Sequence, residues 1–357
     1  MRLLVVGGGS AGHVLPARPV IERFIARGDE VVFVGTNSGL EAQLVDDLQL
    51  EFRSIASGKL RRYWSWENFT DVFRILLGCV QAVMLMLRLK PAVVFSKGGF
   101  VSFPIVFAAW LTRVPVVAHE SDITPGLANR LALPFIKTLC VSFPGSHDSV
   151  QRGGKARVVH TGTPIRAQIL EGDAARGRAA LNLALDKPLL VVTGGSLGAD
   201  RLNAIVRDAA PALCETFHVL HTCGAEKVVP LSIEGYQPVE YVTDGWGDIL
   251  AAADIVVSRA GANALFELLA LRKKTLLVPL PATASRGDQI DNAAYAVSAG
   301  LSRSVAEDAL TSERLCLEVN ELMQPDAELE AALAGFTVPD AVSLLVDELD
   351  RVAKTRA

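Results

Sequence analysis

Short runs of β-branched and other apolar residues alternate with longer segments of helical periodicity along the whole chain. This alternation is typical of parallel α/β units, in which a helix follows each strand and covers the sheet. The strands expected in the first half are Arg2–Val6, Glu30–Val34, Ala92–Phe95, Val114–Ala118 and Thr138–Val141. A second series is expected at Leu189–Val192, Phe217–His221, Glu240–Val242, Ile255–Ser258 and Thr275–Val278.

Both series open in the same way, with an apolar strand, a glycine cluster and a helix start: LLVVGGGSAGH and LLVVTGGSLGA. The repetition predicts two Rossmann-like domains joined near Thr161–Arg166, with the carboxyl ends of both parallel sheets facing a cleft. We expect the first domain at 1–163, the second at 164–340, and a C-terminal helix or tail at 341–357.

Composition agrees with two folded cores, because 50% of the 357 residues are apolar and the mean hydropathy is +0.32. The net charge of −4 hides an asymmetry. Residues 1–163 hold 18 Lys+Arg and 12 Asp+Glu, a charge of +6, whereas the remainder carries −10. An overall acidic chain argues against nucleic acid as a partner. The five cysteines form no Cys-x-x-Cys pair, which indicates neither a disulfide framework nor a zinc site, and favours a reducing compartment.

The first glycine loop, Gly7 to Gly12, formally matches the dinucleotide pattern G-x-G-x-x-G. A dinucleotide site also needs an acid at the end of the second strand, but that strand continues into Gly35-Thr36-Asn37, which disfavours NAD. His13 falls where the next helix should begin. An imidazole there is placed for proton transfer, although a helix-capping role is the alternative.

The second loop, Thr193 to Ala199, lacks the lysine of a P-loop, which disfavours an ATPase. Its backbone amides and the Ser196 hydroxyl could hold a diphosphate at a helix N-terminus, unless it is a plain strand-to-helix turn. Downstream, Glu267 could accept both hydroxyls of a ribose. Gln289 and Asn292, three residues apart on one helical face, suit the hydroxyls of a sugar.

Seven ordered motifs of this chain resemble those of the MurG family, the N-acetylglucosaminyltransferases of peptidoglycan synthesis. They are GGGSAGHVLPA, SKGGFVSFP, HESDITPGLANR, GTPIR, GGSLGA, SRAGANALFE and the Asp-Gln-x-x-Asn-Ala segment, between about Arg2 and Gly300. The resemblance implies a GT-B fold. It also implies transfer of GlcNAc from UDP-GlcNAc to the C4 hydroxyl of undecaprenyl-diphospho-MurNAc-pentapeptide (lipid I), with inversion, to give lipid II.

Carried over by position, the resemblance places the acceptor and donor sugar-phosphate region against Ser10, Ala11 and Gly12, with His13 beside them. It implies a donor-contacting Arg166, a diphosphate-contacting Ser196, a backbone uracil contact at or near Val242, a ribose-binding Glu267, and Gln289 for the sugar hydroxyls. Two departures stand out. Asp122 replaces the asparagine of many members, and Ala11 replaces a glycine.

Direct displacement of UDP needs a base to take the acceptor proton and positive potential at the leaving diphosphate. His13 is the first candidate for the base and Glu120 the alternative. The chain has no Asp-x-Asp triplet for a divalent metal. We therefore expect no metal or other cofactor. The helix after Gly195, with Ser196 and Arg166, is expected to stabilise the leaving diphosphate in place of a metal.

The segment from Trp64 to Leu89 is apolar on every helical face and is flanked by basic residues. A buried core helix and a lipid-facing helix explain it about equally well, and the cations favour an anionic membrane surface. Its uncharged stretch of 13 residues, Ile75 to Leu87, is too short to cross a bilayer. We expect a peripheral protein on the cytoplasmic face of the bacterial plasma membrane, with other cell-wall synthesis and division proteins as further partners.

Three other functions stay open. The first is another GT-B activity, such as a UDP-sugar epimerase or a glycolipid glucosyltransferase. The second is a nucleotide-dependent oxidoreductase. A non-catalytic membrane scaffold is the third, and it is disfavoured because the polar groups converge on one cleft.

Overall fold

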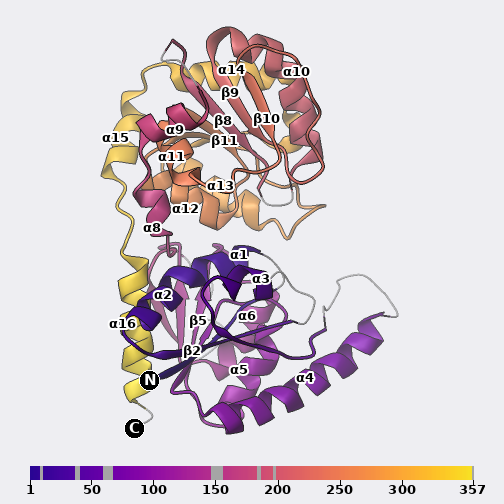
Figure 1. The fold of residues 1–357 in the computed structure, drawn as a ribbon, viewed down its shortest axis with the longest axis vertical. Helices are drawn as coiled ribbons and strands as arrows, with labels where there is room; N and C mark the ends of the chain where they lie inside the picture. Colours follow the sequence, from indigo (N-terminus) through magenta and orange to yellow (C-terminus); the bar gives the residue numbers. More distant parts are fainter. Residues whose placement is uncertain are drawn as a thin grey trace. The chain divides into compact units, whose positions relative to one another are not determined.

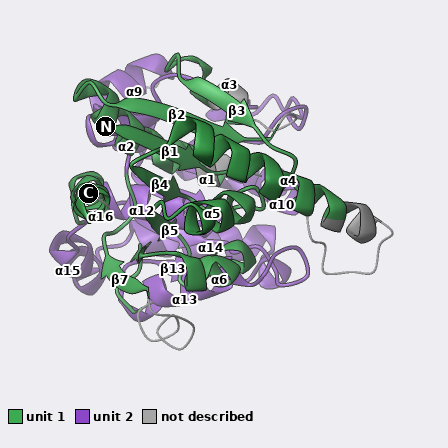
Figure 2. Ribbon diagram, turned by 90° about the horizontal axis from the view of Figure 1, so that it is seen from below, with its two compact units in different colours: residues 1–164, 339–357 green, residues 165–338 purple. Residues whose placement is uncertain are grey.

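The computed structural model describes residues 1–8, 11–36, 41–58, 67–145, 156–182, 186–195 and 198–355. By its internal contacts the chain forms two compact units (Figure 1, Figure 2). Unit 1 comprises Met1–Pro164 and Pro339–Ala357, and unit 2 comprises Ile165–Val338. Each unit is a parallel α/β sheet with helices on both faces, so the two predicted Rossmann-like folds are confirmed.

The sheet of unit 1 has the order β3-β2-β1-β4-β5-β6-β7, with every neighbouring pair parallel. Its strands are β1 (Arg2–Val6), β2 (Glu30–Gly35), β3 (Glu51–Ser54), β4 (Val93–Ser96), β5 (Val116–Glu120), β6 (Thr138–Val141) and β7 (Arg157–His160). The strand order reverses between β1 and β4, which is where ligands bind in open α/β sheets.

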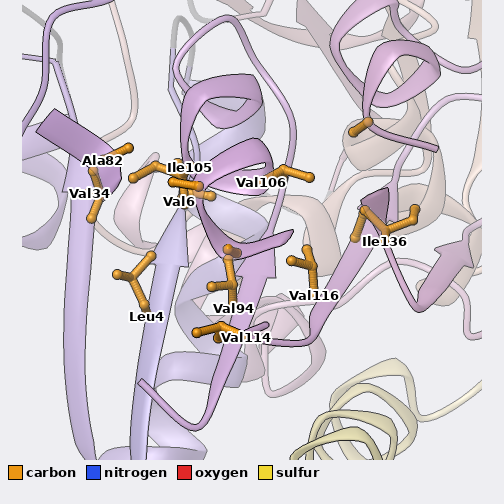
Figure 3. Close-up of a cluster of buried hydrophobic side chains, with 14 of the residues drawn as sticks. Leu4, Val6, Val34, Ala82, Val94, Ile105, Val106, Val114, Val116 and Ile136 are labelled. Atoms are coloured by element: carbon orange, nitrogen blue, oxygen red, sulfur yellow. The ribbon is translucent and has the colours of Figure 1, made fainter. Parts of the chain in front are cut away.

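The helices of unit 1 cover both faces of this sheet. They are α1 (Ala11–Val14), η1 (Leu15–Ala17), α2 (Arg18–Ala26), α3 (Glu41–Asp46), α4 (Glu67–Leu89), α5 (Ser102–Leu111), α6 (Leu127–Ala132), η2 (Leu133–Phe135) and α16 (Ala341–Lys354). Successive side chains of β1 point to opposite faces of the sheet and pack into two separate cores. Leu4 and Val6 pack with α4 and α5 (Figure 3), whereas Leu3 and Val5 pack with α2 and α16.

The last helix, α16, is part of unit 1, a membership that the sequence pattern does not indicate. Leu345 and Leu349 are fully buried in the core under β1. Thr138 Oγ1 in β6 donates to Glu348 Oε1 at 2.5 Å, and Arg27, the C-cap residue of α2, pairs with Asp350 at 2.6 Å. The chain thus returns to unit 1 at Pro339 and completes its core.

The sheet of unit 2 has the order β10-β9-β8-β11-β12-β13. Its strands are β8 (Leu189–Thr193), β9 (His218–Thr222), β10 (Tyr236–Val239), β11 (Ile255–Ser258), β12 (Lys274–Leu277) and β13 (Arg303–Ser304). Its helices are α8 (Ala167–Leu170), α9 (Ala174–Ala180), α10 (Asp200–Thr216), α11 (Trp246–Ala252), α12 (Ala262–Ala270), α13 (Asp288–Ser298), η3 (Glu307–Ala309), α14 (Ser312–Met323) and α15 (Ala327–Gly335).

One predicted strand is wrong. The expected strand at Glu240–Val242 is irregular chain, and β10 lies just before it, at Tyr236–Val239. Pro238 disguises β10 in the sequence, because proline cannot donate to a ladder and is tolerated only at a sheet edge. β10 occupies such an edge, pairing with β9. The edge strands β3, β7 and β13 were also missed.

Candidate active site

The glycine loops after β1 and β4 pack backbone against backbone at the carboxyl edge of the unit 1 sheet. A Cβ added to Gly99 would lie 2.0 Å from the carbonyl oxygen of Gly8, and Gly99 has a φ of +85°. Only glycine tolerates both constraints. Gly8 and Gly99 therefore bring these two loops into close contact at the topological switch point of unit 1.

The helix expected to begin at His13 begins two residues earlier, because α1 spans Ala11–Val14. Gly12 is exposed on it. Ser10 and the side chains of Ala11 and His13 lie outside the described residues, so the roles of these three residues stay predictions.

Sequence reasoning missed a buried carboxylate beside this loop. Glu41, the first residue of α3, is 1% exposed. Its Oε2 accepts a hydrogen bond from Thr36 Oγ1 at 3.4 Å, and its Oε1 lies 2.5 Å from where a Cβ on Gly8 would stand. The sequence contains a signal, because Glu41 is a lone acid shortly after the second strand. Its separation from that strand gave no indication that the carboxylate packs beside the first glycine loop.

Glu120, the last residue of β5, uses both carboxylate oxygens to organise the chain that follows it. Oε1 accepts from the Asp122 amide at 3.1 Å, and Oε2 accepts from the Gly126 amide and from Asn129 Nδ2, both at 2.9 Å. The side chain is 6% exposed. These contacts close the 121–126 loop onto the N-terminus of α6, which makes Glu120 a positioning group here; its role as a base is untested.

In unit 2, the structure brings together two of the residues that the sequence singles out. Arg166 caps the start of α8, and its Nη2 donates to Glu267 Oε1 of α12 at 3.1 Å. Both side chains remain partly accessible, at 28% and 16% exposed. Burial raises the pKa of Glu267, and the charge and hydrogen bond of Arg166 oppose that rise. A cation and a carboxylate thus share one partly accessible site in unit 2.

Gln289 lies next to the start of the helix that carries Glu267. Its Oε1 accepts from the Leu280 amide at 3.1 Å, and its Nε2 lies 4.0 Å from where a Cβ on Gly261 would stand. The N-cap of α12 is Gly261, which has no side chain to bond the first amides of the helix. The helix start therefore offers backbone amides beside the Gln289 amide, a set that suits hydroxyl or phosphate oxygens.

The expectation that Asn292 also binds a sugar is wrong. Asn292 is fully buried, and its Nδ2 donates to the Ala260 carbonyl at 3.0 Å. Residues three apart on a helix are offset by about 60°. This offset directs Asn292 into the loop after β11, while Gln289 stays partly exposed. Asn292 thus holds the loop that precedes α12.

The second glycine loop is equally constrained. Gly198 has a φ of +66°, and a Cβ there would lie 2.2 Å from the Cys223 carbonyl oxygen. The loop ends at α10. The N-cap of this helix is Ala199, whose methyl side chain cannot bond the first amides of the helix. Amides at this helix start are suited to an anion. Ser196 lies outside the described residues, so its diphosphate contact stays a prediction.

Val242 follows β10, and its half-buried side chain packs against the core of unit 2. This packing turns the side chain inward. The predicted uracil contact through its backbone is not tested.

Among the described residues, no group of three or more His, Cys, Asp or Glu side chains could hold a metal ion. Of the helices in the described ranges, none is long and apolar enough to span a membrane.

Sequence profiles of two domains match this chain. They are the glycosyltransferase family 28 N-terminal domain at residues 3–141 and the corresponding C-terminal domain at residues 189–345. Two similar curated proteins are both named UDP-N-acetylglucosamine–N-acetylmuramyl-(pentapeptide) pyrophosphoryl-undecaprenol N-acetylglucosamine transferase. The protein from Legionella pneumophila (strain Paris) is 42% identical over 96% of this chain and 95% of its own. The protein from Clostridium kluyveri is 43% identical over 98% and 99%.

Solved structures agree on the fold. Acinetobacter baumannii MurG superposes with a TM-score of 0.77 at 25% identity, covering 98% of this chain and 99% of that one. A UDP-GlcNAc 2-epimerase from Neisseria meningitidis reaches a TM-score of 0.70 at 15% identity, covering 98% and 100%. The second likeness shows the two-domain GT-B fold alone.

Proposed function

Since the chain belongs to glycosyltransferase family 28, we propose that it transfers GlcNAc from UDP-GlcNAc to the C4 hydroxyl of lipid I, giving lipid II in peptidoglycan synthesis. The observation that carries this proposal is identity above 40% with named lipid I GlcNAc transferases over nearly the full length of both chains. The pairing of Arg166 with Glu267 in the expected donor domain supports it.

The donor side of the proposed reaction lies in unit 2. Glu267 would accept the ribose hydroxyls, Gln289 the sugar hydroxyls, and the backbone near Val242 the uracil. Arg166 and Ser196, with the start of α10, would hold the diphosphate. As UDP leaves, negative charge grows on the diphosphate, and fixed donors aimed there lower the barrier.

The acceptor side lies in unit 1. The first glycine loop, with Ser10, Ala11 and Gly12, would receive the saccharide near its diphosphate. His13 would take the proton from the C4 hydroxyl while the oxygen attacks the anomeric carbon from the face opposite UDP, which inverts that centre. Glu120 is the alternative base.

A single assay tests the proposal. Labelled UDP-GlcNAc is incubated with a lipid I analogue, and the products of the wild type, His13→Ala and Glu267→Ala are compared. We expect the wild type to form labelled lipid II and both variants to be strongly impaired. Release of free sugar or UDP-ManNAc without transfer would instead indicate a hydrolase or an epimerase.

Catalysis is expected to be independent of divalent metal, because amide dipoles and Arg166 take over the stabilisation of the diphosphate. Adding EDTA should leave kcat within about twofold of its value in magnesium. A chelator-induced loss that magnesium or manganese restores would refute this prediction.

We infer that the exposed face of α4 docks on a membrane. One face of the helix is core, since Ala82 and Met86 are buried against the sheet. The opposite face is exposed by more than half of each side chain, at Phe73, Leu76, Leu77, Val80, Met84 and Leu87. The core and lipid hypotheses therefore apply to different faces of the same helix. Trp64, Trp66, Arg61 and Arg62 lie outside the described residues.

Cations accompany this apolar face and support anionic lipid as the partner. Arg74, Arg88 and Lys90 are exposed on or directly after α4, and each contributes about 1 kcal/mol near an anionic surface. A bilayer would also present the lipid-linked acceptor. We accordingly propose peripheral attachment to the cytoplasmic face of the bacterial plasma membrane, with other cell-wall synthesis and division proteins as neighbours.

The double variant Leu76→Asp/Leu87→Asp should lose vesicle binding. Each buried leucine contributes about 2 kcal/mol, so flotation with anionic vesicles should weaken by at least about tenfold. Leu317→Asp is the matched control, because Leu317 is similarly exposed at 47% but lies on α14 in unit 2. Equal flotation of all three proteins would contradict a docking role for α4.

A further inference from the structure

Lys97, directly after β4, is a lysine buried at the carboxyl edge of the unit 1 sheet. Its side chain is 2% exposed. Nζ lies 2.6 Å from His119 Nδ1 and 3.0 Å from Ser121 Oγ. None of the ion pairs that the described residues form involves Lys97. Burying an ammonium that forms no direct ion pair is costly, so its placement needs a functional reason.

The hydrogen bonds of His119 define which partner donates. His119 is fully buried, and its Nε2 lies 2.9 Å from the Gly162 carbonyl oxygen, to which it must donate. Burial and the nearby Lys97 charge hold the pKa of His119 well below its usual range. The imidazole is therefore neutral with its proton on Nε2, and Nδ1 accepts from Lys97.

The second partner of Lys97 is Ser121, the first residue of the 121–126 loop. The carboxylate of Glu120 accepts hydrogen bonds from the amides of Asp122 and Gly126 farther along this loop. Lys97 and Glu120 therefore hold the same loop from two sides. One contact is a side-chain hydroxyl and the others are backbone amides.

The charge of Lys97 responds to pH near neutrality. Burial lowers the pKa of Lys97 to about 7, and the nearby acidic groups of Glu120, Asp122 and Cys140 oppose that shift. His119 faces it from β5 as a neutral group. Deprotonation above pH 7 would remove the charge that strengthens both of its hydrogen bonds.

We propose that Lys97 is a positioning residue for the acceptor, whose ammonium fixes His119 and Ser121 and thereby holds the 121–126 loop in the arrangement that receives the lipid-linked saccharide. This inference rests on the proposed function. Lys97 acts through the loop, because its own side chain is too buried to touch a substrate.

The test replaces Lys97 with methionine, which matches its length and removes the charge. At about pH 6.5, kcat/KM for a lipid I analogue should fall about tenfold, since a small displacement of a positioning loop has effects of this size. KM for UDP-GlcNAc should not change, because the donor residues belong to unit 2. The wild type should lose acceptor kcat/KM above pH 7, and Lys97→Met should lack that decline.

Two controls separate positioning from folding. Lys137→Met removes an exposed lysine at the amino end of β6, at the opposite edge of the sheet, and should keep the wild-type rate and pH profile. Lys97→Met should unfold at the wild-type temperature or higher, because replacing a buried charge with an apolar side chain often stabilises a protein.

Three results would overturn the inference: an unchanged acceptor kcat/KM, a retained alkaline decline, or an equal rise in KM for both substrates. If the wild type transfers no GlcNAc, the proposed function fails instead. The ¹⁵N resonance of His119 Nδ1 then tests the Lys97 contact without turnover. It should move between about pH 6 and 8.5 in the wild type and stay constant in Lys97→Met.

Discussion

His13→Ala is expected to lower kcat by about 10²–10⁴-fold, the usual contribution of a positioned general base. KM for both substrates should change little, because the imidazole acts on a proton that moves only in the transition state. Steady-state kinetics with a lipid I analogue measure both parameters. Binding of UDP-GlcNAc, measured by calorimetry, should be retained.

Glu120→Gln is the variant to compare with it. The glutamine would set an NH₂ group against the Asp122 or Gly126 amide, and two facing donors destabilise a buried site. We therefore expect a lower unfolding temperature and a smaller loss of kcat than for His13→Ala. A Glu120→Gln protein that melts like the wild type but has no activity, beside an active His13→Ala, would identify Glu120 as the base.

Glu267→Ala should raise KM for UDP-GlcNAc by between about tenfold and 100-fold. Hydrogen bonds to a charged group contribute about 1.5–3 kcal/mol, which corresponds to this range of affinity. Glu330→Ala is the matched control, because Glu330 is an exposed carboxylate of the same unit, paired with Lys274 at 2.8 Å. If Glu267→Ala bound UDP as tightly as this control, the proposed ribose contact would be wrong.

The Arg166 pair adds a pH dependence to the same site. Burial already raises the pKa of Glu267, and Arg166 restrains that rise. The carboxylate that accepts ribose hydroxyls is lost as the pH falls through this raised pKa. In Arg166→Met the restraint is removed, so the acid limit of UDP binding should move to higher pH. Calorimetric titrations between about pH 5 and 7.5 would reveal the shift.

Local sequence patterns predicted the central strands and both glycine loops because these features are recorded in neighbouring residues. β1 and β6 have the predicted ends, and α1 begins beside the first glycine loop. Edge strands were harder to predict from the sequence. β10 contains Pro238, and β13 spans two residues, so neither has the alternation that marks a half-buried strand.

Contacts between distant segments explain the other differences. Asn292 shares a helical face with Gln289 in the sequence, but the Ala260 carbonyl, 32 residues away, takes its amide. Lys97 reads as an ordinary polar residue of a glycine loop until β5 places His119 against it. Residue spacing records which side chains share a helix, whereas the partner on another strand depends on the complete sheet.

The return of α16 to unit 1 has a consequence for biosynthesis. Unit 2 is one continuous segment, Ile165–Val338, whereas unit 1 lacks the core residues Leu345, Leu349 and Val352 until all of unit 2 has been synthesised. Domains fold as units on the ribosome. The nascent chain can therefore complete its second sheet first, while the core of the earlier-synthesised sheet stays incomplete until α16 emerges from the exit tunnel.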